Sequence, residues 1–296
     1  MAFSDWLTSD GHFMLFYPWL SSAGDKFVEH GHRLLGALAG LLSIGLVLVV
    51  WRTEPRSWVR KFSLILLAGV VLQGILGGLR VVLDQRTLAL VHGCTGPLFF
   101  ALSVAMVLFT SRWWQTAARL SGKSGADGKK LFRLAVLCAG LAYAQLVIGA
   151  VVRHTPSMTA AASSAWFQVA VYFHLLLALL LVGHIGLLAW RSVRTKLHST
   201  AAVGLVLLIG VQILLGAGTW LLKYGVPYWA TSLLGELNFV IAEADLLQAA
   251  IITSHVAVGS LIFVMALAIA VQLGRQVGLR SQAELNSNSR LAGVAR

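Results

Sequence analysis

Seven apolar runs, each long enough to cross a bilayer, constrain this chain more than any other feature. About 20 apolar residues span the hydrocarbon core as a helix, and lipid offers no partner to unpaired backbone groups, so such runs are helical. We expect helices over about 27–51, 62–81, 88–110, 132–152, 168–190, 202–223 and 250–273. Only 11% of the residues are charged, against about 25% in a soluble domain. The predicted fold class is an all-α integral membrane protein.

The basic residues predict how the chain is oriented. Of the 23 Lys and Arg residues, 17 lie in 52–61, 112–133, 191–196 and 275–296, which are the connections on one side of the membrane. Lys and Arg concentrate on the cytoplasmic side. We therefore expect a multi-pass protein of the cell inner membrane, with its N-terminus outside and its C-terminus in the cytoplasm. The net charge of +12 has this topological explanation, so we expect no nucleic-acid partner.

Three polar stretches divide the chain further. Residues 121–130 are rich in Gly, Ser and Lys, and we interpret them as a cytoplasmic linker between an N-terminal half-bundle, 1–120, and a C-terminal four-helix bundle, 131–275. Residues 276–296 form a cytoplasmic tail that we expect to be disordered from Ser281. The segment 224–249 is too polar to cross the membrane, and we expect it to lie on the outer surface as an interfacial helix.

The two halves repeat each other. The aligned segments begin at His32 and His174, at Gln73 and Gln212, and at His92 and His255. The helix expected over 132–152 has no counterpart in the first half. The pattern predicts two pseudo-repeated four-helix bundles, of which the first helix of the N-terminal half is missing, because it lies upstream of Met1 or has been lost.

The repeat carries four histidines at one depth near the expected outer face: His32, His92, His174 and His255. A small residue follows each of them four positions later, at Gly36, Gly96, Ala178 and Gly259. Residues four apart lie on one helix face, so each small residue leaves room for a flat ring beside its histidine. Two helices that each supply one imidazole describe a bis-histidine haem site in a helical bundle.

Hydrogen bonding and zinc binding fit these histidines less well. A single membrane histidine can simply hydrogen-bond across a helix interface, but four in register are harder to explain in this way. Zinc is disfavoured, because no cysteine accompanies the histidines and no His-x-x-x-His pair occurs on these helices. His12, His154, His184 and His198 are interpreted as structural. Cys94 and Cys138 lie in apolar runs, which disfavours thiol redox chemistry.

Glu29 stands at the mouth of the first helix, where charged residues mark functional sites. Glu29 and His32 are three residues apart and share a helix face, whereas His30 points about 100° away. We therefore favour His32 over His30 as a ligand. The aligned position in the second half is Val171, so the two halves are expected to differ in role. The alternative is that Glu29 is an interfacial charge or a partner of Arg33.

The motif Glu29-x-x-His32-Arg33, together with the three later histidines that head helices, resembles the haem A synthase family of cytochrome oxidase assembly proteins. The stretch from Ser4 to Trp19 is similar to an outer loop of that family. The resemblance covers nearly the whole chain. It departs from the family in lacking the usual first helix and the outer-loop cysteine pair present in some members.

The resemblance implies a membrane oxidoreductase that oxidises the methyl group of haem O to the formyl group of haem A. It implies that His32 and His92 hold the substrate haem as axial ligands of its iron, that His174 and His255 hold a haem b, and that Glu29 is the essential acid. Haem O synthase and terminal oxidase subunits are the implied partners, and a second copy of the chain is a further candidate. The electron donor is left open. The alternative is a di-haem b-type membrane electron carrier, which converts no substrate.

Overall fold

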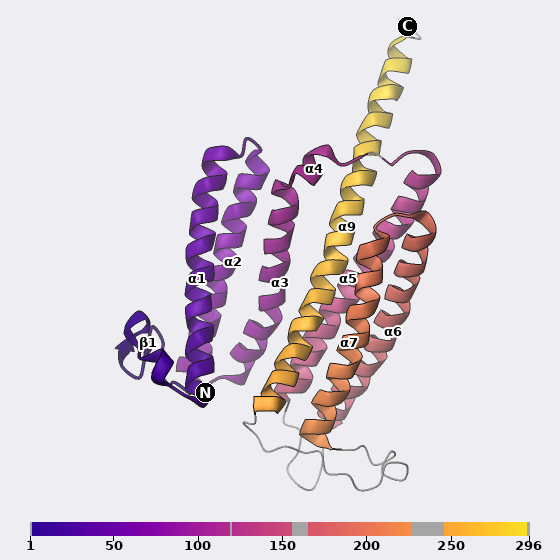
Figure 1. Ribbon diagram of the computed structural model, residues 1–296. Helices are drawn as coiled ribbons and strands as arrows, with labels where there is room; N and C mark the ends of the chain where they lie inside the picture. The colour runs from indigo at the N-terminus through magenta and orange to yellow at the C-terminus, as the bar shows by residue number, and fades with distance from the viewer. Residues whose placement is uncertain (1, 119, 156–164, 226–245, 295–296) are drawn as a thin grey trace, which may run out of the picture. The chain divides into compact units, whose positions relative to one another are not determined.

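Long helices make up most of the chain (Figure 1). The computed structural model describes residues 2–118, 120–155, 165–225 and 246–294, with side chains up to Gly278. The helices are α1 (Gly24–Thr53), α2 (Ser57–Val82), α3 (Arg86–Thr110), α4 (Arg112–Thr116), α5 (Gly122–His154), α6 (Ala165–Thr195), α7 (Ser199–Tyr224) and α9 (Leu246–Val294). Among them, seven are long and apolar enough to span a membrane. The predicted all-α integral membrane fold with seven spans is confirmed.

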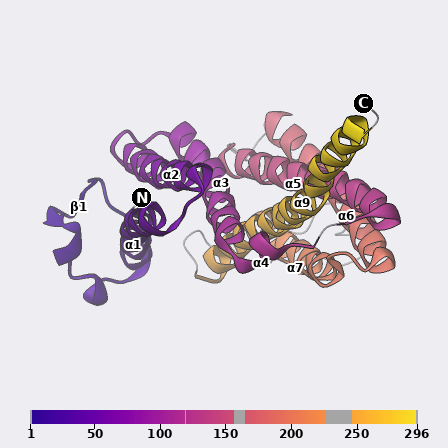
Figure 2. The same ribbon diagram turned by 90° about the horizontal axis from the view of Figure 1, so that it is seen from above.

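The contacts divide the chain into two compact units. The first unit comprises Met1–Ser111 and Val147–Val171, and the second comprises Arg112–Leu146 and Tyr172–Arg296. In the first unit, α2 packs between α1 and α3; in the second, α7 packs against α9. Figure 2, which looks along the helices, shows α1, α2 and α3 as neighbours and α5, α6, α7 and α9 gathered as a group.

A proline ends α1, and an arginine that follows it contacts the end of α3. Pro55 disfavours a helical conformation at the residue before it, and Glu54 accordingly leaves the helix with an extended backbone while its N–H still donates to Val50. Arg56 then donates from Nη2 to the carbonyl of Phe109, at the end of α3, across 2.8 Å. A cation is favourable beside the exposed carbonyls of a helix C-terminus. This contact joins the turn between α1 and α2 to α3.

The best-packed part of the first unit lies at the end remote from its histidines. Val50, Val59, Leu66 and Met106 form a buried cluster in which none is more than 4% exposed. These residues come from the end of α1, the beginning of α2 and the end of α3. Burial of apolar side chains therefore holds the three helices together at this end, and the opposite end, with His32 and His92, carries fewer buried side chains.

The structure corrects two expectations about the polar stretches. Residues 122–130 are not a loop but the first turns of α5, because Gly125 and Gly128 are buried and the side chain of Leu120 packs over Gly128. The tail is helical rather than disordered, since α9 continues to Val294. Most of the expected interfacial segment, 226–245, lies outside the described residues.

The sequence did not predict the small structure that precedes α1. Strands β1 (Thr8–Ser9) and β2 (His12–Phe13) form an antiparallel hairpin in which Ser9 pairs with His12. Two short 3-10 turns, Met14–Phe16 and Trp19–Ser21, lead from the hairpin into α1. We call residues 2–21 the N-terminal segment. Figure 1 shows it beside the beginning of α1.

Candidate functional site: two histidine pairs and an acidic helix mouth

His32 of α1 and His92 of α3 form the first histidine pair. Their ring centroids are 6.2 Å apart and their planes meet at 85°. His32 is exposed and His92 is half-buried. The packing of α1 and α3 on α2 thus brings together two of the four histidines that the repeat singled out, both within the first unit.

His174 of α6 and His255 of α9 form the second pair, within the second unit. Their ring centroids are 6.5 Å apart and their planes meet at 61°. Both side chains are half-buried. The two halves of the repeat therefore give two histidine pairs of nearly equal separation.

Both separations suit a haem iron held between two imidazoles. A metal–nitrogen bond of about 2 Å places two opposite ring centroids roughly 6 Å apart, which matches both pairs. Nδ1 of His92, His174 and His255 is buried and has no hydrogen-bond partner. Among the described residues no group of three or more His, Cys, Asp or Glu side chains gathers as a metal site. Bis-histidine ligation needs no such group.

Glutamines accompany the second pair. The amide nitrogen of Gln145 lies 3.2 Å from Nε2 of His174 and donates to the carbonyl of the same residue at 3.0 Å. The amide nitrogen of Gln212 lies 3.4 Å from Nε2 of His255. Each histidine of the second pair thus has a glutamine amide beside its Nε2 atom.

The small residues that follow the histidines have different surroundings. A side chain added at Gly36 would meet nothing within 4 Å, so the space beside His32 is open. At Gly96 it would meet only Oε1 of Gln73, at 3.9 Å. At Gly259 it would lie 3.1 Å from the amide nitrogen of Gln212 and 3.2 Å from a methyl carbon of Leu146, so the space beside His255 is filled by these side chains. Ala178, beside His174, is half-buried.

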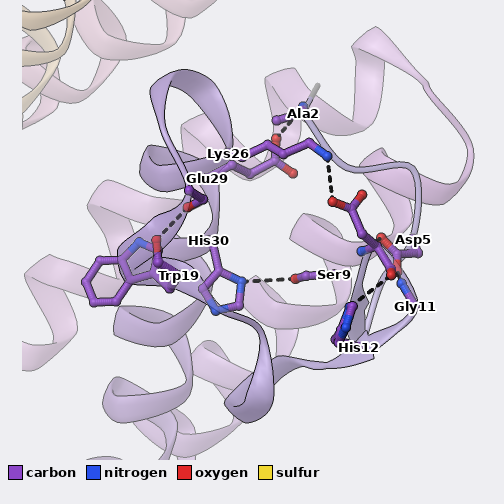
Figure 3. A network of polar contacts seen from close by, with 11 residues as sticks. Ala2, Asp5, Ser9, Gly11, His12, Trp19, Lys26, Glu29 and His30 are labelled. Atoms are coloured by element: carbon purple, nitrogen blue, oxygen red, sulfur yellow. Dashed lines mark hydrogen bonds and ion pairs between the residues drawn. The ribbon is translucent and has the colours of Figure 1, made fainter.

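Glu29 lies at the contact between α1 and the N-terminal segment (Figure 3). Its Oε2 accepts a hydrogen bond from the backbone N–H of Ala2 at 2.9 Å, as Figure 3 shows. Its Oε1 accepts one from Nη2 of Arg33, also at 2.9 Å. Arg33 also donates from Nη1 to the carbonyls of Asp5, at 3.0 Å, and Thr8, at 2.8 Å. The partnership with Arg33 that the sequence left as an alternative is present in the structure. The bond from Arg33 fixes the position of the Glu29 carboxylate, and Glu29 is three residues before His32 on α1.

His30 belongs to the same contact and not to a histidine pair. It is 1% exposed, its Nδ1 lies 3.0 Å from Oγ of Ser9, and its ring centroid is 4.6 Å from that of Tyr17. Figure 3 shows the ring directed at Ser9. His30 therefore anchors the N-terminal segment, whereas His32 lies beside His92.

The N-terminal segment is also ordered by its own acids. Burial works to raise the pKa of the Asp5 carboxyl, but the backbone N–H groups of Gly11 and Asp10 donate to it and, with the Thr8 side chain, lower that pKa overall. Asp10 in turn forms an exposed ion pair with Lys26 of α1. The segment is thus tied to α1 by both its charged and its aromatic side chains.

Sequence reasoning missed the glutamines as part of the site. Gln73 and Gln212 were recognised as repeated residues but were given no role, although both stand on the helix that faces a candidate ligand. Gln73 donates to Oγ1 of Thr95, which lies one turn along α3 from His92, across 2.5 Å. Repetition of the same polar residue in two apolar helices was the signal that could have found them, since buried amides in membrane helices need partners.

Comparison with known proteins decides the family. The family described as COX15-CtaA, Cytochrome oxidase assembly protein, matches residues 21–233. This chain belongs to that family. The match includes three of the four paired histidines and Glu29, and the predicted resemblance is confirmed.

A curated relative in the COX15-CtaA family is the heme A synthase of Geobacillus kaustophilus (strain HTA426). The two chains are 33% identical over 143 residues, which is 47% of this chain and 44% of the relative. The alignment thus spans less than half the length of either protein. No solved structure matches this chain.

Proposed function

We propose that this COX15-CtaA protein is a haem A synthase, which oxidises the methyl group of haem O to the formyl group of haem A for cytochrome oxidase. The observation that carries the proposal is the presence of two histidine pairs, with ring centroids 6.2 and 6.5 Å apart. Their spacing suits two haems, and their chain belongs to a family of cytochrome oxidase assembly proteins.

We assign substrate haem O to His32 and His92 and a resident haem b to His174 and His255. The first pair has the open space beside Gly36, which suits a molecule that must enter and leave. The second pair is enclosed by Gln145 and Gln212, which suits a haem that stays. Bound there, haem b supplies one-electron chemistry.

Glu29 is the proposed catalytic acid of the substrate site. Converting a methyl to a formyl group breaks two C–H bonds, forms one C=O bond and removes four electrons, so an oxidant and a source of the oxygen atom must be supplied besides the residues of this chain. A carboxylate beside the reacting carbon can accept a proton or stabilise developing positive charge. The bonds from Arg33 and Ala2 fix this carboxylate at the mouth of α1, on the helix that carries His32.

We further propose that the protein lies in the cell inner membrane with its C-terminus in the cytoplasm. The 17 basic residues counted on one side support this orientation. The histidine pairs then lie near the outer face. A haem O synthase would supply the substrate, and terminal oxidase subunits would receive the product.

A di-haem electron carrier remains the second candidate, and one observation favours it. Glu29 is a partner of Arg33 and Ala2, so its presence has a structural explanation that involves no substrate. A carrier needs the four histidines but converts nothing.

The test replaces Glu29 with Gln in cells that also make haem O, followed by chromatography of the extracted haems. The amide keeps the shape and can still accept a hydrogen bond from Arg33, but it carries neither charge nor a transferable proton. We expect Glu29→Gln to retain both haems and to accumulate haem O or a hydroxylated form of it. Glu54→Gln is the matched control, because Glu54 lies at the other end of α1 and pairs with Arg56.

Two results would count against the proposal. A parent protein that binds two haems and produces no haem A would favour the electron carrier. A parent that produces haem A, with normal output from Glu29→Gln, would remove Glu29 from the chemistry and leave the enzyme assignment intact.

A further inference from the structure

A glutamine followed four residues later by a glycine occurs at aligned positions of the two halves, on α2 and on α7, and each of these two copies faces a candidate iron ligand. Gln73 and Gly77 stand on α2, opposite His92 of α3. Gln212 and Gly216 stand on α7, opposite His255 of α9. The neighbouring Gly74 has no such contact, since a side chain added there would meet nothing within 4 Å.

The two histidine rings lie against their glycines in the same way. A Cβ added at Gly77 would be 3.2 Å from Cε1 of His92, 3.6 Å from its Nδ1 and 3.8 Å from its Nε2. At Gly216 the same three distances to His255 would be 3.0, 3.6 and 3.8 Å. Because the two copies differ in most of the surrounding sequence, this agreement indicates a constraint on the ring and not a packing accident.

The spacing of four residues has a physical reason. In an α-helix the carbonyl of residue i accepts the N–H of residue i+4, and the Cβ of residue i+4 tilts back toward that carbonyl. A glycine at i+4 leaves the carbonyl accessible from the side, and the second lone pair of the oxygen is free to accept. The rings of His92 and His255 lie against the glycines that expose the main-chain carbonyls of Gln73 and Gln212.

Those carbonyls suit the ring nitrogens that lack partners. Nδ1 of His92 and Nδ1 of His255 are buried without a hydrogen bond of good geometry. A histidine that binds a metal through one nitrogen donates its other N–H to a carbonyl or carboxylate, which sets the tautomer and the ring orientation.

We propose that Gly77 and Gly216 are positioning residues that set the ring planes of His92 and His255 for iron ligation, each by opening the carbonyl four residues earlier to Nδ1. This inference rests on the proposed function, since it takes both histidines as axial ligands. Neither glycine touches the iron, and each acts through its histidine. His174 has a different support, the side chain of Gln145.

The test is Gly216→Ala, because its added Cβ would make the closer contact. The purified variant is titrated with haemin, and the ferric low-spin signal is recorded by electron paramagnetic resonance, whose largest g value depends on the angle between the axial ring planes. We expect haemin to bind roughly tenfold more weakly or worse, as for other residues that orient a metal ligand. We also expect a shifted g value in the haem that is retained.

Gly210→Ala is the matched control on α7, since a side chain there would meet nothing within 4 Å. Alanine is the better helix former, so neither change weakens the helix itself. Gly77→Ala, with its contact 0.2 Å longer by the distances above (3.2 − 3.0), is expected to show a smaller effect of the same kind. If Gly216→Ala fails to fold, the Gly77→Ala variant tests the proposal in its place. Gly74→Ala is the control for Gly77→Ala on α2.

The outcomes separate this inference from the function on which it rests. A parent and a Gly210→Ala variant that take up no low-spin haem would overturn both. A parent that takes up haem, with the haemin affinity and g value unchanged in Gly216→Ala, would overturn the inference alone. A g value that stays unchanged while the amount of folded protein falls would reduce the glycine to a packing role and likewise overturn it.

Discussion

Arg33 donates from Nη2 to Oε1 of Glu29, one helical turn earlier on α1, across 2.9 Å. The two side chains are only 11% and 14% exposed, and Arg33 lies over the ring of Phe3. Since the same guanidinium holds two carbonyls of the N-terminal segment, this pair links the mouth of α1 to the residues that cover it.

Replacing Arg33 with Gln is expected to release the N-terminal segment. Hydrogen bonds to a charged group contribute about 2 kcal/mol each when buried, and Arg33 makes three that would be lost or weakened. Limited proteolysis should therefore cut residues 2–21 faster in the variant, while α1 to α3 stay intact. Lys26→Gln serves as the control, because its pair with Asp10 is about 44% exposed and such pairs contribute little. Equal cutting of the parent and Arg33→Gln would show that these bonds are not needed to hold the segment.

The second histidine pair is expected to account for the resident haem. His174→Ala or His255→Ala should abolish most low-spin haem absorbance, because one axial ligand is removed. His184→Ala should leave it, since His184 bonds the carbonyl of Leu180 on its own helix and belongs to neither pair. Visible spectra of the purified variants check this. A full low-spin spectrum in His174→Ala would refute the assignment of the ligand.

The stability of the protein against unfolding is expected to fall at acid pH because of Glu54. Hydrogen bonds from the Arg56 side chain lower the pKa of the Glu54 carboxyl from 4.5 to about 2. Because the folded-state pKa is depressed, the stabilisation is fully present above about pH 4.5 and is lost as the pH falls toward 2. Thermal unfolding in detergent, measured between about pH 2 and 6, should show this decline, and Glu54→Gln should flatten it. A parent curve no steeper than that of Glu54→Gln would rule out the contribution.

The orientation is testable with reporters at two positions. A reporter that works only in the cytoplasm is expected to be active when fused after Arg296, and alkaline phosphatase, which works only outside, when inserted at Asp84. The reason is the concentration of 17 of the 23 basic residues on one side. The reverse pattern would invert every loop and place the histidine pairs near the cytoplasmic face.

The membrane helices and the candidate ligands could be predicted from the amino-acid sequence alone. Apolar runs of membrane length leave one solution for the backbone, so all seven spans were found, although α5 begins ten residues before the predicted start. The four histidines were found because a repeat preserves spacing, and spacing along a helix is readable without a structure.

Which side chains meet depends on the packing of the helices and could not be predicted in this way. Periodicity along one helix cannot show that Gln212 and Gly216 lie against the ring of His255, because these contacts join two different helices. The glycines that suggested a linker at 121–130 instead allow close packing at the start of α5. The roles of His30 and Arg33 were likewise open, since the sequence gives no sign that the N-terminal segment folds back on α1. Membership of a helix is a local property, whereas the surroundings of a residue depend on how the helices pack.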